Sequence, residues 1–367
     1  MALTFTEEQE ELRTTLRRFL ADKAPSAAVR RAMDSDEGHD PRLWRQMADQ
    51  LGLHGLALPE AYGGFGGGPV ELGIVLEELG RVLLPSPYFA TVALAGQALA
   101  ASNDEEAKAR WLPGIADGST TATLALAEES GSWRLEDIET SAEHGTVSGT
   151  KMFVVDGHTA DLMLVMARTG TGPGLFAVDG DAPGVTRTRL ETLDPTRRLA
   201  RVDLDDVPVR RVGPDGDSSP YLRTVLDLVA VALAAEQVGG ARACLDAAVA
   251  YAKVRVQFGR PIGSFQAVKH KCADLLVQVE AARSAAYHAA AVAAEGSSEL
   301  PVSAALAAAC CADAFSHAAK ENIQIHGGIG YTWEHDAHLH LKRAKSSEQL
   351  FGGPAMHRTR LADLVGI

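Results

Sequence analysis

The sequence predicts an α+β fold made of three consecutive blocks: an N-terminal helical domain, a middle antiparallel β-domain and a C-terminal helical domain. Two observations lead to this prediction. Apolar residues recur at helical spacing in the first and last thirds, while the middle third contains short alternating runs rich in β-branched residues. A chain of 367 residues is also long enough for two or three domains with sizeable cores. We place the domains at residues 1–115, 116–215 and 216–367.

The first block begins with a capping box, Thr6-Glu-Glu-Gln9, which is a signal for a helix start. The apolar stripe of this first helix consists of Leu12, Leu16, Phe19 and Leu20. The glycine-rich PEAYGGFGGGP (59–69) lacks the lysine of a phosphate-binding P-loop, and no strand clearly precedes it. We therefore interpret it as a connector between helices.

The middle block contains five predicted strand segments, separated by Gly, Asp and Pro. Their sequences are TATLALAEE, HGTVSGTKMFVVDG, DLMLVMART, GLFAVDG and LARVDLDDVPV. We interpret the last, charge-rich segment as a solvated strand at a sheet edge. GPDGDSSP (213–220) is the predicted linker into the last block.

The last block reads as helices again, turned at Pro261 and Gly263. Further helices are predicted at about 300–325 and after Pro354. The spacing of six apolar residues predicts one buried face on the helix after the turn: Phe265, Val268, Cys272, Leu275, Leu276 and Val279.

Composition excludes several classes of function. A net charge of −13 argues against a nucleic-acid partner, because phosphate binding needs a basic face. We see no secretory signal at the N-terminus and no run of eighteen apolar residues, so no membrane span is predicted. The four cysteines lack a CxxC spacing, and we expect them to be reduced and buried. We therefore predict a cytoplasmic protein.

Two stretches carry residues suited to an anionic ligand: 250–275, with Arg255 and Gln266, and 321–336, with His326-Gly327-Gly328. Arg255 offers a planar fork of donors that fits a pyrophosphate. Gln266 begins a helix, whose free N–H groups favour an anion. Taken singly, an arginine near a turn usually caps a helix, and a GGxG string is a weak signal.

Together, RxQFGRPIGSFQ and QIHGGIGYT resemble the C-terminal domain of the FAD-dependent acyl-CoA dehydrogenases, and the order of the three blocks is also similar. The resemblance implies that the last block is a four-helix bundle. It also implies an acyl-CoA substrate and an electron-transfer flavoprotein as electron acceptor. It also implies that six residues contact the ADP half of an FAD seated mainly on a neighbouring subunit: Arg255, Phe258, Gln266, Gln324, Gly327 and Gly328.

The chemistry implied by the resemblance needs a carboxylate to take the α-proton of the thioester while the flavin takes the β-hydride. Aligned on the family's two known positions for this base, the sequence has Phe351 and Val229. Asp227 and Glu236 are the remaining weak candidates. We interpret both as ordinary solvated or interface residues.

The flavin-facing strings of the family are altered as well. The LTEPxxGSD-like string reads LAEESGSW, with Ala127 in place of threonine, Glu129 in place of proline and Trp133 in place of aspartate. The WIT-like string reads Phe153-Val154-Val155, so a second hydroxyl is missing.

This split pattern resembles the non-catalytic subunit of the α2β2 acyl-CoA dehydrogenases, which are associated with bulky substrates such as steroid side-chain CoA thioesters. We therefore predict a subunit without its own base that completes the FAD site of a catalytic partner. Two alternatives remain. One is a homo-oligomeric enzyme whose relocated base is Glu236 or Asp227, and the other is a flavin-free binding or scaffold protein.

A metal site is not predicted. His335, His338 and His340 lie close together with Asp336, but no HExxH or paired-cysteine pattern accompanies them.

Overall fold

The computed structural model describes residues 4–367, which fold into two compact units. The first unit contains the chain up to Arg31, Gly73–Leu84 and Ala230–Ile367. The second contains Ala32–Leu72 and Pro85–Val229. The predicted domain boundaries at 115/116 and 215/216 stay a prediction. The secondary structure nevertheless changes where expected, because strands are confined to the middle of the chain apart from one two-stranded hairpin near residue 260.

The N-terminal third is helical. Its helices are α1 (Glu7–Lys23), α2 (Ser26–Asp34), α3 (Pro41–Asp49), η1 (Glu60–Tyr62), α4 (Pro69–Arg81), the π-helix η2 (Phe89–Gly96), α5 (Gln97–Ala100) and α6 (Glu105–Ala116). The predicted capping box is confirmed: the Gln9 amide donates to Thr6 Oγ1 (3.3 Å), and the Thr6 amide donates to Gln9 Oε1 (3.0 Å). The glycine-rich 59–69 connects α3 to α4, as predicted.

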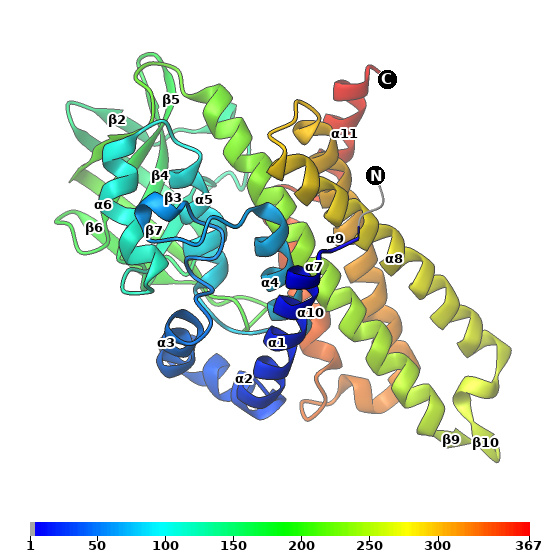
Figure 1. Ribbon diagram of the computed structural model, residues 1–367. Coiled ribbons are helices and arrows are strands. Elements are labelled where there is room, and N and C mark those ends of the chain that lie inside the picture. The colour runs from blue at the N-terminus through cyan, green and yellow to red at the C-terminus, as the bar shows by residue number, and fades with distance from the viewer. Residues whose placement is uncertain (1–3) are drawn as a thin grey trace. The chain divides into compact units, whose positions relative to one another are not determined.

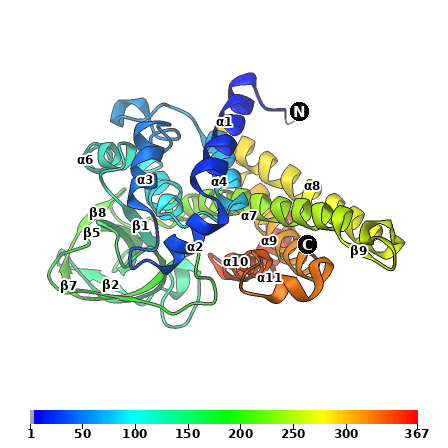
Figure 2. The same cartoon turned by 90° about the horizontal axis from the view of Figure 1, so that it is seen from below.

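The middle third forms an eight-stranded sheet (Figure 2) with the order β6-β7-β3-β2-β4-β5-β8 and β1 paired with β4. The strands are β1 (Ala122–Ala125), β2 (Ser141–Glu143), β3 (Thr146–Val155), β4 (Leu162–Thr169), β5 (Gly172–Asp179), β6 (Val185–Arg189), β7 (Leu199–Pro208) and β8 (Arg210–Val212), with η3 (Leu135–Asp137) between β1 and β2. Most ladders are antiparallel, but β1 and β2 run parallel to β4. The stretch between β1 and β4 is long enough for a parallel connection.

The expectation that the charge-rich strand β7 lies at a sheet edge is wrong. It pairs with β3 on one side and β6 on the other. Its apolar residues Ala200, Val202, Leu204 and Val207 belong to the buried core of the sheet. Arg201 and Asp203 alternate with these residues and lie on the opposite face, whereas Asp205 and Asp206 lie where the register with β3 shifts. Charge content was therefore a poor guide to the position of this strand in the sheet.

The C-terminal third is a helical bundle, as predicted. Its elements are α7 (Ser219–Val254), β9 (Val256–Gln257), β10 (Arg260–Pro261), η4 (Ile262–Ser264), α8 (Gln266–Ala294), α9 (Leu300–His326), η5 (Gly327–Tyr331), α10 (Ala337–Gln349) and α11 (Pro354–Val365). Figure 1 shows α7, α8 and α9 side by side, with β9 and β10 at the far end of α7 and α8.

Some expectations for this bundle need correction. Leu276, placed on the buried face by its spacing, is 46% exposed, and its neighbour Val277 is 70% exposed. The cysteines are free, but Cys310 is exposed and Cys272 is only half-buried.

Two helical stretches, α7 and Leu300–Tyr331, are long and apolar enough to cross a membrane, yet 83% and 67% of their apolar windows are buried in the protein. This burial is typical of core helices.

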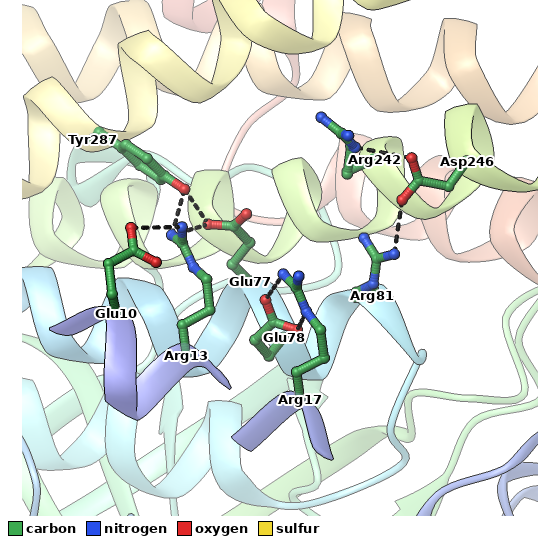
Figure 3. Close-up of polar contacts among 9 residues, drawn as sticks. All are labelled: Glu10, Arg13, Arg17, Glu77, Glu78, Arg81, Arg242, Asp246 and Tyr287. Carbon is green, nitrogen blue, oxygen red and sulfur yellow. Dashed lines mark hydrogen bonds and ion pairs between the residues drawn. The ribbon is translucent and has the colours of Figure 1, made fainter. Parts of the chain in front are cut away.

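Charged side chains fix α1 within the first unit (Figure 3). Arg13 contacts Glu77 of α4 (3.3 Å) and the Tyr287 hydroxyl of α8 (2.5 Å), and Tyr287 donates to Glu77 (2.7 Å). One turn further along α1, Arg17 forms a two-point ion pair with Glu78, whose side chain is only 2% exposed. These buried acids therefore have their partners within the chain.

Candidate functional site

The first predicted stretch forms a hairpin tip, residues 255–266, between α7 and α8. Gln257 pairs with Arg260 across β9 and β10, and the two residues between them, Phe258 and Gly259, have φ angles of +54° and +76°. Positive φ at both positions defines the tight two-residue turn of a β-hairpin. The Ile262 amide donates to the Arg255 carbonyl (2.8 Å), which closes the base of the tip.

The predicted ligand-binding side chains of this tip point outward. Phe258 is 91% exposed, and Arg255 and Gln266 are exposed as well. Across residues 4–367, Arg255 forms no ion pair. Phe265, the N-cap residue of α8, provides no side-chain acceptor for the first amides of that helix. An uncapped helix start next to an unpaired guanidinium suits an anionic ligand.

The second predicted stretch lies at the end of α9. Gln324 is exposed, and Gly327 and Gly328 follow it. Gly327 has a φ of +64°, which favours glycine. A Cβ added at Gly327 or Gly328 would meet no atom within 4 Å, so packing within this chain does not require glycine at either position. The open space would admit a ligand close to the backbone.

The structure brings the two stretches together at one end of the bundle. Tyr251 of α7 stacks on His326 of α9, with ring centroids 4.3 Å apart and an interplanar angle of 26°. Ala248, Ala252 and Ile325 share a buried cluster, with Ile262 packed against it. The ends of α7 and α9 are therefore fixed relative to each other, although the whole of α8 lies between them in the sequence.

The two segments predicted to face a flavin, LAEESGSW and Phe153-Val154-Val155, belong to the second unit. Ala127 and Val155 are each 1% exposed, and neither offers a hydroxyl. The Val155 carbonyl accepts a hydrogen bond from Thr123 Oγ1 (2.5 Å), and the Ala127 carbonyl accepts one from the Met152 amide (2.8 Å). Phe153 has a φ of +56° where the β3–β7 register shifts. The backbone carbonyls at these two positions are therefore hydrogen-bonded within the unit, and their side chains are apolar and offer no hydroxyl donor.

The acidic residues of LAEESGSW pair within the same unit. Lys151, which is fully buried, donates to Glu128 (2.6 Å) and to the Leu126 carbonyl (3.0 Å). Burial lowers the pKa of Lys151 to about 8, while Glu128 opposes that shift. Glu129 forms an ion pair with Arg201 (2.9 Å) at the surface. Sequence reasoning missed the Lys151–Glu128 pair, because it joins residues 23 positions apart that only the sheet brings together.

Phe351 and Val229, the two residues that the sequence analysis aligns with the family's base, are both apolar. Phe351 is 6% exposed with a φ of +56°, and Val229 is fully buried. Of the weak candidates, Glu236 forms a buried ion pair with Arg343, and Asp227 is 2% exposed. Burial shows that neither acid is solvated, and the alternative that they are interface residues stays a prediction. For Glu236, the pairing with Arg343 occupies the carboxylate.

No metal centre is apparent in the described part of the chain. Residues 4–367 contain no group of three or more His, Cys, Asp or Glu side chains arranged to hold a metal ion.

A helical N-terminal region, a central sheet and a helical bundle ending in an exposed hairpin tip form the architecture of acyl-CoA dehydrogenases, and the chain belongs to this family. The sequence matches the family models for the acyl-CoA dehydrogenase N-terminal domain over residues 6–119, middle domain over 123–207 and C-terminal domain over 220–365. The protein is therefore a member of a family of oxidoreductases.

Within this family, the chain is similar to several individual proteins and solved structures. The acyl-CoA dehydrogenase IpdE2 of Mycobacterium tuberculosis is 40% identical over 355 residues, covering 96% of this chain and 95% of the relative. The fold is similar to a solved variant of the steroid acyl-CoA dehydrogenase Tcur3481–Tcur3483 (TM-score 0.90, 35% identity, 98% of both chains). It is also similar to the ChsE4–ChsE5 complex of M. tuberculosis (TM-score 0.92, 30% identity, 100% of this chain and 99% of that one).

Proposed function

We propose that this chain is a subunit of a heteromeric FAD-dependent acyl-CoA dehydrogenase, in which it completes the FAD site of a catalytic partner and supplies no base itself. The observation that carries the proposal is a contrast within the chain. Residues of the kind that reach a neighbour's FAD are exposed, unpaired and close together, as Arg255 illustrates. The positions of the chain's own half-site have lost their hydroxyls and their carboxylate, as Ala127 and Phe351 illustrate.

In this proposal Arg255 binds the pyrophosphate of FAD through its guanidinium fork, with the uncapped start of α8 adding a favourable field. Gln266 and Gln324 offer side-chain amides to the ADP half, and Phe258 offers a flat apolar surface. Gly327 and Gly328 let the cofactor approach the backbone closely. FAD, when bound, supplies the acceptor for the hydride of the acyl-CoA.

Two similar structures support a paired assembly, since one is a complex of ChsE4 with ChsE5 and the other joins Tcur3481 with Tcur3483. We propose an α2β2 assembly by this similarity. The steroid acyl-CoA dehydrogenase among them also supports a bulky, steroid-type CoA thioester as substrate. An electron-transfer flavoprotein as electron acceptor and a cytoplasmic location complete the proposal.

The test is the visible spectrum of the tagged chain, purified first alone and then together with the acyl-CoA dehydrogenase chain that co-purifies with it. We expect little flavin on the chain alone and about one FAD per pair of different chains in the complex. A homotetramer with one FAD per chain would instead support a self-sufficient enzyme that uses Glu236 or Asp227. Absence of flavin in every state would support a binding or scaffold role.

A further inference from the structure

The glycine segment, residues 327–336, connects α9 to α10 and contains Gly327 and Gly328. Its large side chains lie outside the core: Tyr331 is 72% exposed, Trp333 is 70% exposed and Ile329 is 48% exposed. Apart from the buried Gly330, the segment from 327 to 334 is exposed. Core packing therefore contributes little to fixing its position, and polar contacts must do much of this.

Two side chains of α2, Arg30 and Ser26, make such contacts. Arg30 of α2 donates from Nη1 to the Trp333 carbonyl (2.6 Å) and from Nη2 to Asp336 Oδ1 (2.6 Å). Ser26, one turn earlier on α2, donates to the same Asp336 oxygen (2.8 Å). Arg30 is about one-quarter exposed and Asp336 is 40% exposed. Charge-assisted bonds at two points fix both the backbone and the end of the segment.

The start of the segment is fixed separately by stacked rings. His326 lies between Tyr251 and His335, with centroid distances of 4.3 Å and 4.4 Å. Its Nδ1 atom lies 2.8 Å from the Asn322 carbonyl. The Tyr251–His326 stacking restrains the base of the segment, and the tilted His326–His335 ring pair joins this base to residue 335. In the residues between, Trp333 also contacts His338 and Lys342. Arg30 restrains that part through Trp333 and Asp336.

We propose that Arg30 is a positioning residue for FAD binding, which acts by holding the glycine segment so that Gly327 and Gly328 keep their place beside the hairpin tip. The inference rests on the proposed function, because it assumes that the glycine segment contacts FAD. A guanidinium is needed since one group must reach a carbonyl and a carboxylate in different directions, which a lysine ammonium on a flexible stem does poorly.

The test compares Arg30→Gln and Arg30→Lys with a matched control, Arg31→Gln. Arg31 is the next residue on α2, is exposed, and forms no ion pair within the described residues. In the complex with the co-purified partner, release of FAD is followed by the rise in flavin fluorescence after dilution. We expect both Arg30 variants to release FAD about 5- to 20-fold faster, within the usual range for coupled sites. Arg31→Gln should match the wild type.

A second readout isolates positioning from general stability. Hydrogen exchange of the free chain should increase in residues 328–336 in Arg30→Gln, while far-UV circular dichroism and exchange in α9 remain unchanged. If Arg30→Gln prevents assembly, Asp336→Asn takes its place, because it keeps the side-chain volume and the Arg30 contact to the Trp333 carbonyl. Asp336→Asn should then speed FAD release, and an unchanged rate would overturn the inference.

Failure of the inference is distinguishable from failure of the proposed function. If Arg30→Gln leaves FAD release unchanged while Arg255→Ala in the same complex accelerates it, the positioning role is overturned and the FAD site stands. If neither variant alters FAD release, this chain does not contribute to the FAD site, and both proposals fail.

Discussion

Arg255 and Arg343 belong to the same helical unit but differ in every respect that decides their role. Arg343 is 3% exposed and forms a buried ion pair with Glu236. Arg255 is exposed at the hairpin tip and has no ion-pair partner in residues 4–367. A buried charge must find its partner within the fold, whereas an exposed charge can serve a ligand or another chain.

The same contrast separates larger regions. Glu77, Glu78 and Glu128 are buried acids whose oxygens contact basic side chains of this chain. Around Gly327 and Gly328, by contrast, an added Cβ would meet nothing. Internal pairing thus marks charges that the fold uses, whereas exposed positions without such pairing are open to a ligand or another chain.

The largest expected effect concerns the catalytic base. Losing a positioned general base costs about 10²- to 10⁴-fold in rate. If the proposed catalytic partner supplies the base, substituting its glutamate should abolish turnover. Asp227→Asn and Glu236→Gln should each leave the turnover of the assembled complex within a small factor of the wild type. The assay is acyl-CoA-dependent reduction of an artificial electron acceptor, normalised to bound FAD.

A several-hundredfold loss on Glu236→Gln, at unchanged FAD content, would show that the buried pair conceals a catalytic carboxylate. A charge paired within the chain would then serve catalysis as well as the fold, and the distinction between paired and unpaired charges would not hold.

The next effect concerns stability. Glu236→Gln removes the negative charge from a buried ion pair with Arg343, which should lower the free energy of unfolding by about 3–5 kcal/mol. Urea denaturation measures this loss. The double variant Glu236→Leu/Arg343→Met is the matched control, since replacing both partners with apolar groups should recover most of the stability. Equal losses in the single and double variants would contradict the assigned pairing.

Arg255→Ala should affect binding and leave stability nearly unchanged. A charge-assisted contact contributes about 1.5–3 kcal/mol, so the affinity of the complex for FAD should fall about 10- to 150-fold. Arg255→Lys should also be impaired, since an ammonium does not replace the fork. Titration of the apo-complex with FAD measures both. Unchanged affinity would remove Arg255 from the site, and a large loss of stability would mean that the fold uses it.

The smallest effect concerns pH and Glu77. Burial raises the pKa of Glu77, with Arg13 and the Tyr287 hydroxyl opposing the shift. Between the unfolded value near 4.5 and the raised folded value, the folded state binds more protons. The free energy of unfolding therefore falls as pH rises through this window. Glu77→Gln lacks this contribution, so urea unfolding at pH 5, 6 and 7 should show a less negative slope than the wild type. Parallel slopes would refute the shift.

The sequence by itself determined the elements with short-range causes. The capping box at Thr6 specifies the start of α1 through contacts three residues apart. The change from helical spacing to alternation located the sheet, and Pro261 marked the turn between α7 and α8. The six residues predicted to contact FAD came from the resemblance of two local motifs to a family, and the structure brings the two stretches together at one end of the bundle.

Only the tertiary structure decided which distant residues meet. It placed β7 inside the sheet, exposed Leu276 despite its spacing, and paired Glu236 with Arg343 and Arg30 with Asp336. Capping and turn signals depend on backbone hydrogen bonds within a few residues, so they can be read from the sequence. The partner of a buried charge depends on how whole helices pack, which the sequence does not show locally. Burying a charge without a counter-charge costs free energy, so the packed fold places the two charges together.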